Sequence, residues 1–163
     1  MTMIYFKDTA IGKIGIEETG GYITKLVFEN DVKKIGESRA IFDEKEAPPI
    51  LLKAFQQLDE YLNGERTVFD LPLAPKGTPF TEKVWAALRE IPYGRTVSYK
   101  DVAEAIGNPR ASRAVGTANN KNPIAIFIPC HRVIGSNGKL VGYSAGTDLK
   151  QKLLALENTE ECD

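Results

Sequence analysis

The stretch on which the interpretation depends is IFIPCHRVI, residues 126–134, which places a thiol next to an imidazole at the end of an apolar run. Ile and Phe favour buried strands, and Pro129 cannot donate a hydrogen bond to a sheet, so we expect a strand that ends there and a fixed turn after it. Cys130 and His131 would then lie on rigid backbone. Because His131 is the only histidine in the chain, any imidazole chemistry has to use it.

Adjacency of Cys130 and His131 is by itself a weak signal of catalysis. A buried cysteine is often a small, inert hydrophobic residue, and neighbouring residues of a strand point to opposite faces. The two side chains can cooperate if a water molecule bridges them or if the turn after Pro129 brings them together. Whether the pair is inert or reactive has to be judged from the surrounding sequence.

Composition limits the classes of protein that fit. A chain of 163 residues that is 42% hydrophobic predicts one or two small domains with an ordinary core. No apolar run approaches the roughly 18 residues that span a membrane, and the N-terminus lacks the pattern of a signal peptide. Two cysteines, Cys130 and Cys162, do not form a disulfide framework. We therefore expect a cytoplasmic protein.

Charge is unevenly distributed along the chain. The net charge of −1 argues against a nucleic-acid partner, but residues 1–78 carry −3 whereas residues 79–157 carry +5. The half that contains Cys130 is therefore the basic half, as expected for a protein that meets a polyanion. An ordinary mixed, solvated surface is the alternative.

The first half has the pattern of a small, structural α/β domain. Short apolar or alternating runs separated by turns predict an antiparallel meander, followed by a charged, irregular stretch and one helix. The strands are expected at Ile4–Phe6, Lys13–Glu17 and Tyr22–Phe28, the irregular stretch at 30–48, and the helix from Pro48-Pro49 to Leu62. Prolines and a glycine in residues 71–77 predict a linker, which gives domains 1–77 and 78–163.

The second half predicts three helices. One begins at Thr78-Pro79, and a second at Ser98–Asp101, which resembles a capping box. The third, Arg110–Asn119, would bury Ala111, Ala114, Val115 and Ala118 and expose Arg110, Arg113, Thr117 and Lys121. Two short helices joined by a tight turn indicate a helix-turn-helix, with a plain helical hairpin as the alternative. The expected fold is therefore α+β: a small antiparallel-sheet domain and a mainly helical, winged-helix-like domain.

These residues resemble a known family, the O6-alkylguanine-DNA alkyltransferases, also called methylated-DNA–protein-cysteine methyltransferases. The resemblance covers residues 78–157, and five blocks come in the family's order and spacing. The N-terminal half is similar to the family only in length and element order. The blocks are Arg113–Gly116, Asn122-Pro123, Ile128–Val133, Gly142–Gly146 and Leu153–Glu157.

The resemblance implies DNA repair by single-turnover alkyl transfer to the protein's own cysteine. A thiolate is the best soft nucleophile among the amino acids, so Cys130 would take the alkyl group from O6-alkylguanine, and O4-alkylthymine is a further possible substrate. His131 would remove the thiol proton through a water, and Glu157 would orient the imidazole. Asn122 would tie the helix-turn-helix to the active-site segment. Neither a metal nor an organic cofactor is implied.

The resemblance also implies a partner, double-stranded DNA, read from the minor groove by a monomer. The alkylated base has to leave the stack, and Arg113 would enter the space that it vacates. Tyr99 would help to turn the target phosphate and hydrogen-bond the base. The carbonyl groups of Cys130 and Val133 would accept from the exocyclic amine. The pocket would be lined by Tyr143 and Ser144.

Three departures from the family pattern stand out. Ala145 replaces a glycine common in the loop that holds Tyr143 and Ser144, and Asn119 stands where some members have an apolar residue that packs against DNA bases. The upstream cysteine cluster of a zinc-binding module is missing. Two other classes remain open: a module that binds damaged bases without reacting, against which Cys130 speaks, and a helix-turn-helix regulator. Alkyl transfer to the protein would discriminate against both.

Overall fold

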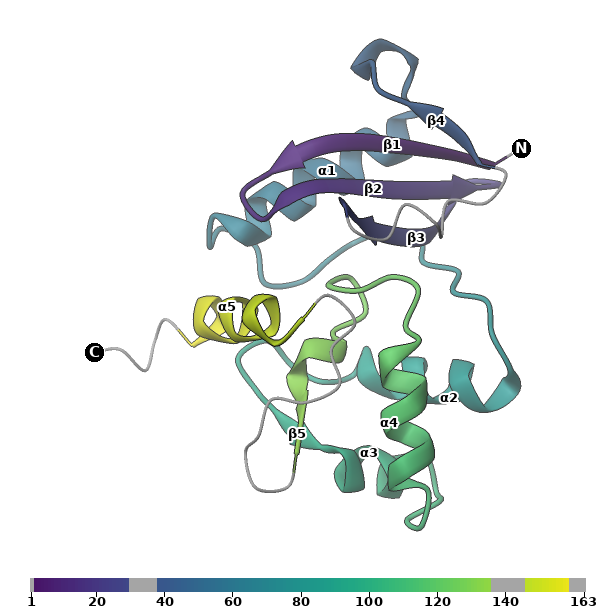
Figure 1. The fold of residues 1–163 in the computed structure, drawn as a ribbon, viewed down its shortest axis with the longest axis vertical. Helices are drawn as coiled ribbons and strands as arrows, with labels where there is room; N and C mark the ends of the chain where they lie inside the picture. Colours follow the sequence, from purple (N-terminus) through teal and green to yellow (C-terminus); the bar gives the residue numbers. More distant parts are fainter. Residues whose placement is uncertain (1, 30–37, 136–145, 159–163) are drawn as a thin grey trace. The chain divides into compact units, whose positions relative to one another are not determined.

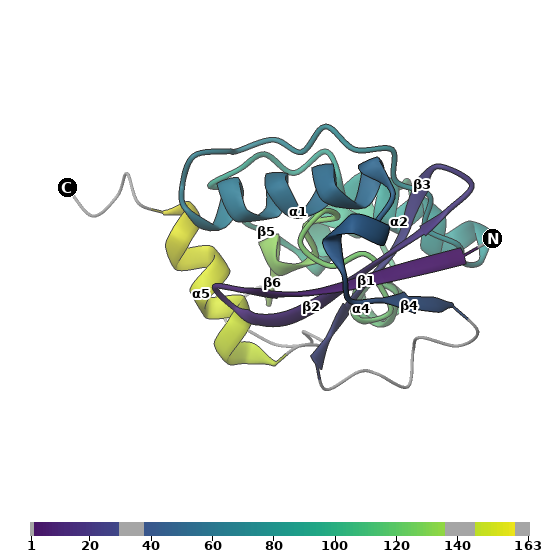
Figure 2. The same cartoon turned by 90° about the horizontal axis from the view of Figure 1, so that it is seen from above.

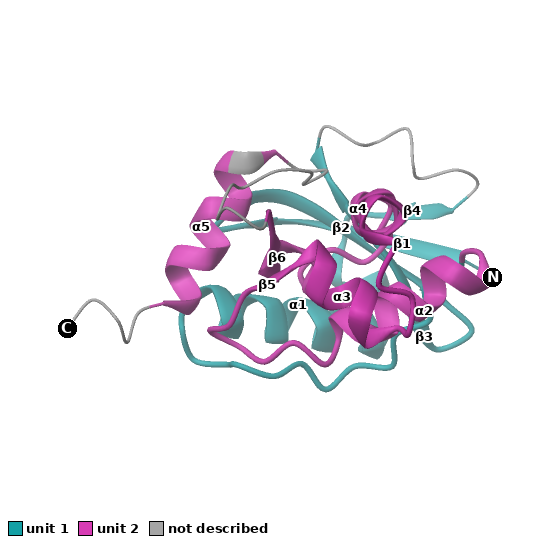
Figure 3. Ribbon diagram, turned by 90° about the horizontal axis from the view of Figure 1, so that it is seen from below, with its two compact units in different colours: residues 1–76 teal, residues 77–163 magenta. Residues whose placement is uncertain are grey.

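The computed structural model describes residues 2–29, 38–135 and 146–158 (Figure 1). The chain divides into two compact units, residues 1–76 and residues 77–163 (Figure 3). The two units differ in their secondary structure. A sheet and one long helix make up the first unit, and short helices dominate the second.

The first unit is built on a four-stranded sheet of order β3-β2-β1-β4. Strands β1 (Thr2–Thr9), β2 (Gly12–Thr19) and β3 (Tyr22–Phe28) form the predicted antiparallel meander. Gly20 and Gly21 both have positive φ, which the tight turn between β2 and β3 requires. The fourth strand, β4 (Arg39–Ile41), pairs parallel with β1. It lies in the stretch that we expected to be irregular, and that expectation was wrong.

Helix α1 (Pro49–Leu62) follows a short 3-10 helix, η2 (Glu44–Glu46), and packs against the sheet (Figure 2). Apolar residues spaced by three and four positions form its buried side, as predicted from the sequence. The helix ends at Asn63-Gly64, where Gly64 adopts a positive φ. The core of this unit combines Leu51, Phe55, Leu58 and Tyr61 of the helix with Ile4, Ile14, Ile16 and Ile23 of the sheet.

The second unit contains four helices and two very short strands, α2 (Pro79–Leu88), β5 (Val97–Ser98), α3 (Tyr99–Ala105), α4 (Ser112–Asn120), β6 (Val133–Ile134) and α5 (Thr147–Glu157), among its described residues. The two predicted helix starts are confirmed. Thr78 Oγ1 accepts from the backbone of Thr81, and Ser98 and Asp101 form a reciprocal capping box. Strands β5 and β6 pair in parallel. No helix in the described ranges is long and apolar enough to cross a membrane.

Helix α4 presents a basic and polar face to solvent and packs its other face on α2 and α3. Arg110, Arg113, Thr117 and Lys121, in and beside the helix, are exposed as predicted. Ala114 was predicted to be inside and is exposed instead. The buried stripe of the helix consists of Val115, Ala118 and Asn119, and the indole Nε1 of Trp85 donates to the carbonyl of Ala118 at 2.9 Å.

The apolar segment before Cys130 is not the strand that its composition predicted. Residues 124–128 fold back on themselves, with the amide of Ile128 donating to the carbonyl of Ile124 at 2.9 Å and Ile126 at φ 75°. Asn122 stabilises this turn because its Oδ1 accepts from the amide of Ile124 and its Nδ2 donates to the carbonyl of Ile128. Side-chain bonds to backbone thus replace the ladder of a sheet. The cysteine and histidine follow on a 3-10 helix, η3 (Cys130–Arg132).

Candidate active site

Cys130 and His131 lie on η3, directly after Pro129 and before β6. A 3-10 helix has three residues per turn, so neighbouring side chains project about 120° apart rather than to opposite faces. The objection that adjacent strand residues point apart therefore does not apply here. Both side chains are buried, with 2% of Cys130 and none of His131 exposed. The structure thus places a thiol and an imidazole inside the second unit, on the same turn.

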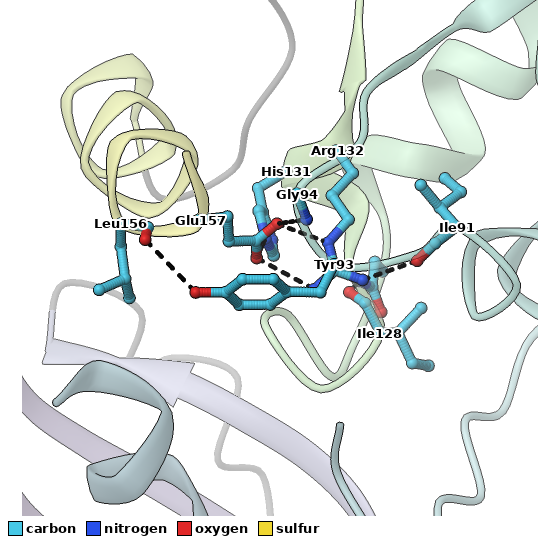
Figure 4. A network of polar contacts seen from close by, with 9 residues as sticks. Ile91, Tyr93, Gly94, Ile128, His131, Arg132, Leu156 and Glu157 are labelled. Carbon is cyan, nitrogen blue, oxygen red and sulfur yellow. Dashed lines mark hydrogen bonds and ion pairs between the residues drawn. The ribbon is translucent and has the colours of Figure 1, made fainter. Parts of the chain in front are cut away.

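The carboxylate of Glu157, at the end of α5, is the centre of a buried polar network (Figure 4). Its Oε2 is 2.6 Å from His131 Nε2 and accepts from Arg132 Nη2 at 3.0 Å. Its Oε1 accepts from Arg132 Nε at 2.8 Å and from the amide of Gly94 at 3.3 Å. Because a carboxylate only accepts hydrogen bonds, His131 carries its proton on Nε2, and Nδ1 is the nitrogen with a lone pair.

Arg132 fixes Glu157 from a second direction. Its guanidinium binds the carboxylate through two nitrogens, and its Nη1 donates to the carbonyl of Ile91 at 2.7 Å. The same group lies over the ring of Tyr93, 5.8 Å from the centroid, and the hydroxyl of Tyr93 donates to the carbonyl of Leu156 at 3.3 Å. Arg132 was part of the motif quoted from the sequence, but no role was predicted for it.

A second charged residue that the sequence analysis missed is Lys150. Its side chain is fully buried, and its Nζ donates to the carbonyl of Val133 at 2.6 Å. Lys150, Leu153 and Glu157 share the buried face of α5, at the spacing i, i+3 and i+7. One helix therefore brings a cation close to Cys130 and a carboxylate to His131. That spacing in the sequence was the signal that could have identified Lys150.

The protonation of the Cys130–His131 pair follows from its burial. Burial raises the pKa of the Cys130 thiol to about 11, although a hydrogen bond from Asn122 and the charge of Lys150 act in the opposite direction. Burial also lowers the pKa of His131, against the opposing effect of Glu157. At neutral pH the pair is therefore a neutral thiol and a neutral imidazole. The thiol needs a base, and the imidazole is in the form that can act as one.

Two asparagines hold the backbone around Cys130. Asn122 contributes the hydrogen bonds of the turn described above, and Asn119 Nδ2 donates to the carbonyl of Cys130 at 3.3 Å. Asn119 is 1% exposed. From the sequence we noted only that some family members have an apolar residue at this position that packs against DNA bases. In this chain the side chain connects α4 to the cysteine from within.

The remaining predicted site residues lie in three places. Tyr99, the first residue of α3, is close enough to Cys130 for the thiolate to add to the effect of burial in raising the pKa of its phenol. Val133, in β6, is fully buried. Arg113 lies on the exposed face of α4. Tyr143, Ser144 and Ala145 lie outside the described residues.

Within the described ranges, no three histidine, cysteine or carboxylate side chains gather as metal ligands.

Together, these features define a class of site: a buried nucleophile, a base and a carboxylate that orients the base, in a helical unit with an exposed basic helix. Comparison with known proteins gives the family. The family model described as "6-O-methylguanine DNA methyltransferase, ribonuclease-like domain" matches residues 3–75. The model described as "6-O-methylguanine DNA methyltransferase, DNA binding domain" matches residues 79–159. The chain belongs to the 6-O-methylguanine DNA methyltransferase family.

Individual relatives agree with this assignment. The constitutive methylated-DNA–protein-cysteine methyltransferase of Bacillus subtilis is 46% identical over 151 residues, which cover 92% of each protein. A methylated-DNA–protein-cysteine methyltransferase of Methanosarcina acetivorans is 60% identical over 107 residues, 66% of this chain and 69% of the relative. Among solved structures, Mycobacterium tuberculosis OGT in complex with DNA is 41% identical, with a TM-score of 0.87 over 96% of this chain and 93% of that one. The expected α+β fold with a sheet unit and a helical unit is confirmed.

Proposed function

We propose that this protein repairs DNA by moving an alkyl group from the O6 atom of guanine to Sγ of Cys130. The observation that carries the proposal is the 2.6 Å contact between His131 Nε2 and Glu157 Oε2 beside the buried thiol. The family match over both units supports it, as do relatives named methylated-DNA–protein-cysteine methyltransferase. The similar Mycobacterium tuberculosis structure with bound DNA supports DNA as the partner.

The reaction is a displacement at the alkyl carbon. Sγ of Cys130 forms a bond to that carbon while the bond from carbon to O6 breaks, and the electron pair leaves with guanine. The thiol proton passes to Nδ1 of His131 through a water, and the resulting imidazolium is stabilised by Glu157. The departing base takes up a proton, and the phenol of Tyr99, close to Cys130, would hydrogen-bond it. The product is a thioether without an easy leaving group, so each molecule reacts once.

The charges on α5 favour the proton transfer in the direction that the reaction needs. Lys150 stabilises the thiolate that forms at Cys130, and Glu157 stabilises the cation that forms at His131. In a buried site such interactions are stronger than in water because the surrounding dielectric is low. Arg132 keeps Glu157 in place through charge-assisted bonds. Arg132 and Lys150 are thus positioning and electrostatic residues beside the reacting pair.

DNA would bind through α4 in the minor groove, with the alkylated guanine turned out of the stack. The exposed basic face of α4 supports this, and Arg113 on that face would fill the vacated space. Tyr99, Val133, Tyr143 and Ser144 would contact the extruded base. The unit formed by residues 1–76 lacks comparable chemistry in its described part, and we assign it a structural role. A reactive thiol fits a reducing compartment, so we place the protein in the cytoplasm, acting as a monomer.

The proposed function is tested by measuring the conversion of O6-methylguanine to guanine in DNA. A duplex with a single O6-methylguanine, in molar excess over the protein, is incubated to completion, digested to nucleosides and analysed for guanine and O6-methylguanine. We expect conversion to guanine in a ratio of one lesion per protein molecule, and no conversion with Cys130→Ala, which should still bind the duplex. Binding without conversion by the wild-type protein would instead indicate a damage-binding module or a regulator.

A further inference from the structure

The amide of Asn119 is a buried polar group that the proposed mechanism does not use. Its Nδ2 donates to the carbonyl of Cys130 at 3.3 Å. Its Oδ1 is buried and has no hydrogen-bond partner among the described residues. Burying an acceptor without a donor costs free energy. In native proteins such a group is commonly satisfied by a bound water, an ion or a ligand. The position of Asn119 next to the nucleophile favours a ligand.

The orientation of this amide is fixed by its neighbour. If the two ends were exchanged, Oδ1 would face the carbonyl oxygen of Cys130, and two acceptors would repel each other. Nδ2 therefore stays on the carbonyl, and Oδ1 is the end directed away from it. Asn119 thus offers an acceptor adjacent to, but distinct from, the Cys130 carbonyl.

The acceptors around Cys130 can be counted. The carbonyl of Cys130 accepts from Asn119 Nδ2 and from the amide of Val133, so both of its lone pairs are used. The carbonyl of Val133 accepts from Lys150 Nζ, which leaves one lone pair. The exocyclic amine of guanine has two N–H groups. By resemblance, both were expected on the carbonyls of Cys130 and Val133, but the structure leaves Val133 O and Asn119 Oδ1 as the acceptors with capacity.

We propose that Oδ1 of Asn119 accepts a hydrogen bond from the exocyclic amine of the extruded purine, which makes Asn119 a residue that selects guanine derivatives. This inference rests on the proposed function. It predicts discrimination against a base that carries the same alkyl group but lacks the amine, namely O6-alkylhypoxanthine. The loss with such a base has two parts, the missing bond and the acceptor left buried without a donor.

The experiment compares second-order rate constants for two free bases, O6-benzylguanine and O6-benzylhypoxanthine, so that DNA binding does not contribute. The wild-type protein should react about 5- to 10-fold faster with the guanine compound, the effect of one hydrogen bond. Asn119→Leu should lower this ratio by slowing the reaction with the guanine compound, while the carbonyl of Val133 remains as an acceptor. The matched control is Asn120→Leu, on the next residue of α4, which is exposed and should leave the ratio unchanged.

Three results would overturn the inference. Equal rates for the two bases with the wild-type protein would show that no group reads the amine. An unchanged ratio in Asn119→Leu, with both rates lowered, would show that Asn119 only supports the backbone. If Asn119→Leu does not fold, as judged by circular dichroism, Asn119→Ser replaces it, and an unchanged ratio there has the same meaning. Absence of transfer from both bases would overturn the proposed function itself, and the inference with it.

Discussion

At the scale of single residues, burial disfavours the ionised forms of Cys130 and His131, and the charges of Lys150 and Glu157 act in the opposite direction. Burial raises the pKa of Cys130 to about 11, so a preformed thiolate is scarce at neutral pH, and the rate depends on His131 as the base. Arg113, in contrast, is exposed to solvent on α4. The two residues should therefore fail in different ways when they are replaced.

The first prediction separates base extrusion from chemistry. Arg113→Ala should slow the repair of O6-methylguanine in duplex DNA by about tenfold or more, because the energy of unstacking, a few kcal/mol, is no longer offset by the arginine. The reaction with free O6-benzylguanine should stay within about twofold, since that substrate is not stacked. His131→Ala should slow both reactions by about 10²-fold or more. Equal impairment of both substrates by Arg113→Ala would make this residue structural.

At the scale of elements, α5 and the turn before η3 create the site, and they differ in how well the sequence predicts them. Capping residues lie within three residues of the bonds that they form, so the sequence alone predicts where a helix begins. Helices α2 and α3 begin where expected. The apolar run at 124–128 has the composition of a strand, but the side-chain bonds of Asn122 close it into a turn. Those bonds depend on three-dimensional contacts that composition does not reveal. The buried Lys150 was missed for a different reason: a lysine is ordinarily exposed, and its spacing from Leu153 and Glu157 was not taken as a sign of burial.

The second prediction concerns the cation on α5. Lys150→Met should keep much of the apolar packing but remove the charge that favours the Cys130 thiolate, so the pKa of Cys130 should rise further. Transfer from free O6-benzylguanine at pH 7 should slow by about tenfold for each unit of that rise. Rates measured across a pH series should show the ascending limb displaced to higher pH.

The control for this prediction lies on the same helix. Lys152→Met removes an equal charge from an exposed position of α5, and its rate and pH profile should match those of the wild-type protein. A pH profile of Lys150→Met that coincides with the wild-type profile, at any absolute rate, would contradict an electrostatic role for Lys150.

At the scale of the whole molecule, we assign the chemistry to the second unit and a structural role to the first. Much of the first unit could be predicted because alternating runs and glycine turns specify a meander locally, whereas β4 is only three residues long and is defined by its pairing with β1. The members of the reactive group come from residues 99 to 157, and the resemblance, not any local pattern, connected Glu157 to His131. Asn119 and Arg132 acquire their contacts only in the folded unit.

The third prediction is a pH dependence of stability. His131 has a lowered pKa in the folded protein, so the unfolded chain binds more protons below about pH 6.5, and stability should fall as pH falls below that value. Cys130 has a raised pKa, so its contribution is fully present below the usual thiol pKa. That contribution, about 3 kcal/mol, should be lost as the pH rises from about 9 to about 11.

Urea unfolding of the wild-type protein at a series of pH values measures this dependence. In Cys130→Ala the loss between about pH 9 and about pH 11 should be smaller than in the wild-type protein, and the loss at low pH should persist. Identical alkaline limbs in the two proteins would show that other groups with a raised pKa, such as Tyr99, account for the alkaline loss.

The central claim is that Cys130 itself becomes the alkyl acceptor, and the intact mass of the protein after incubation with O6-methylguanine DNA tests it most directly. The account predicts a gain of one methyl group per molecule, located on Cys130 by peptide mapping, with no gain in Cys130→Ala. An unchanged mass, or a methyl group found on Cys162, would contradict it.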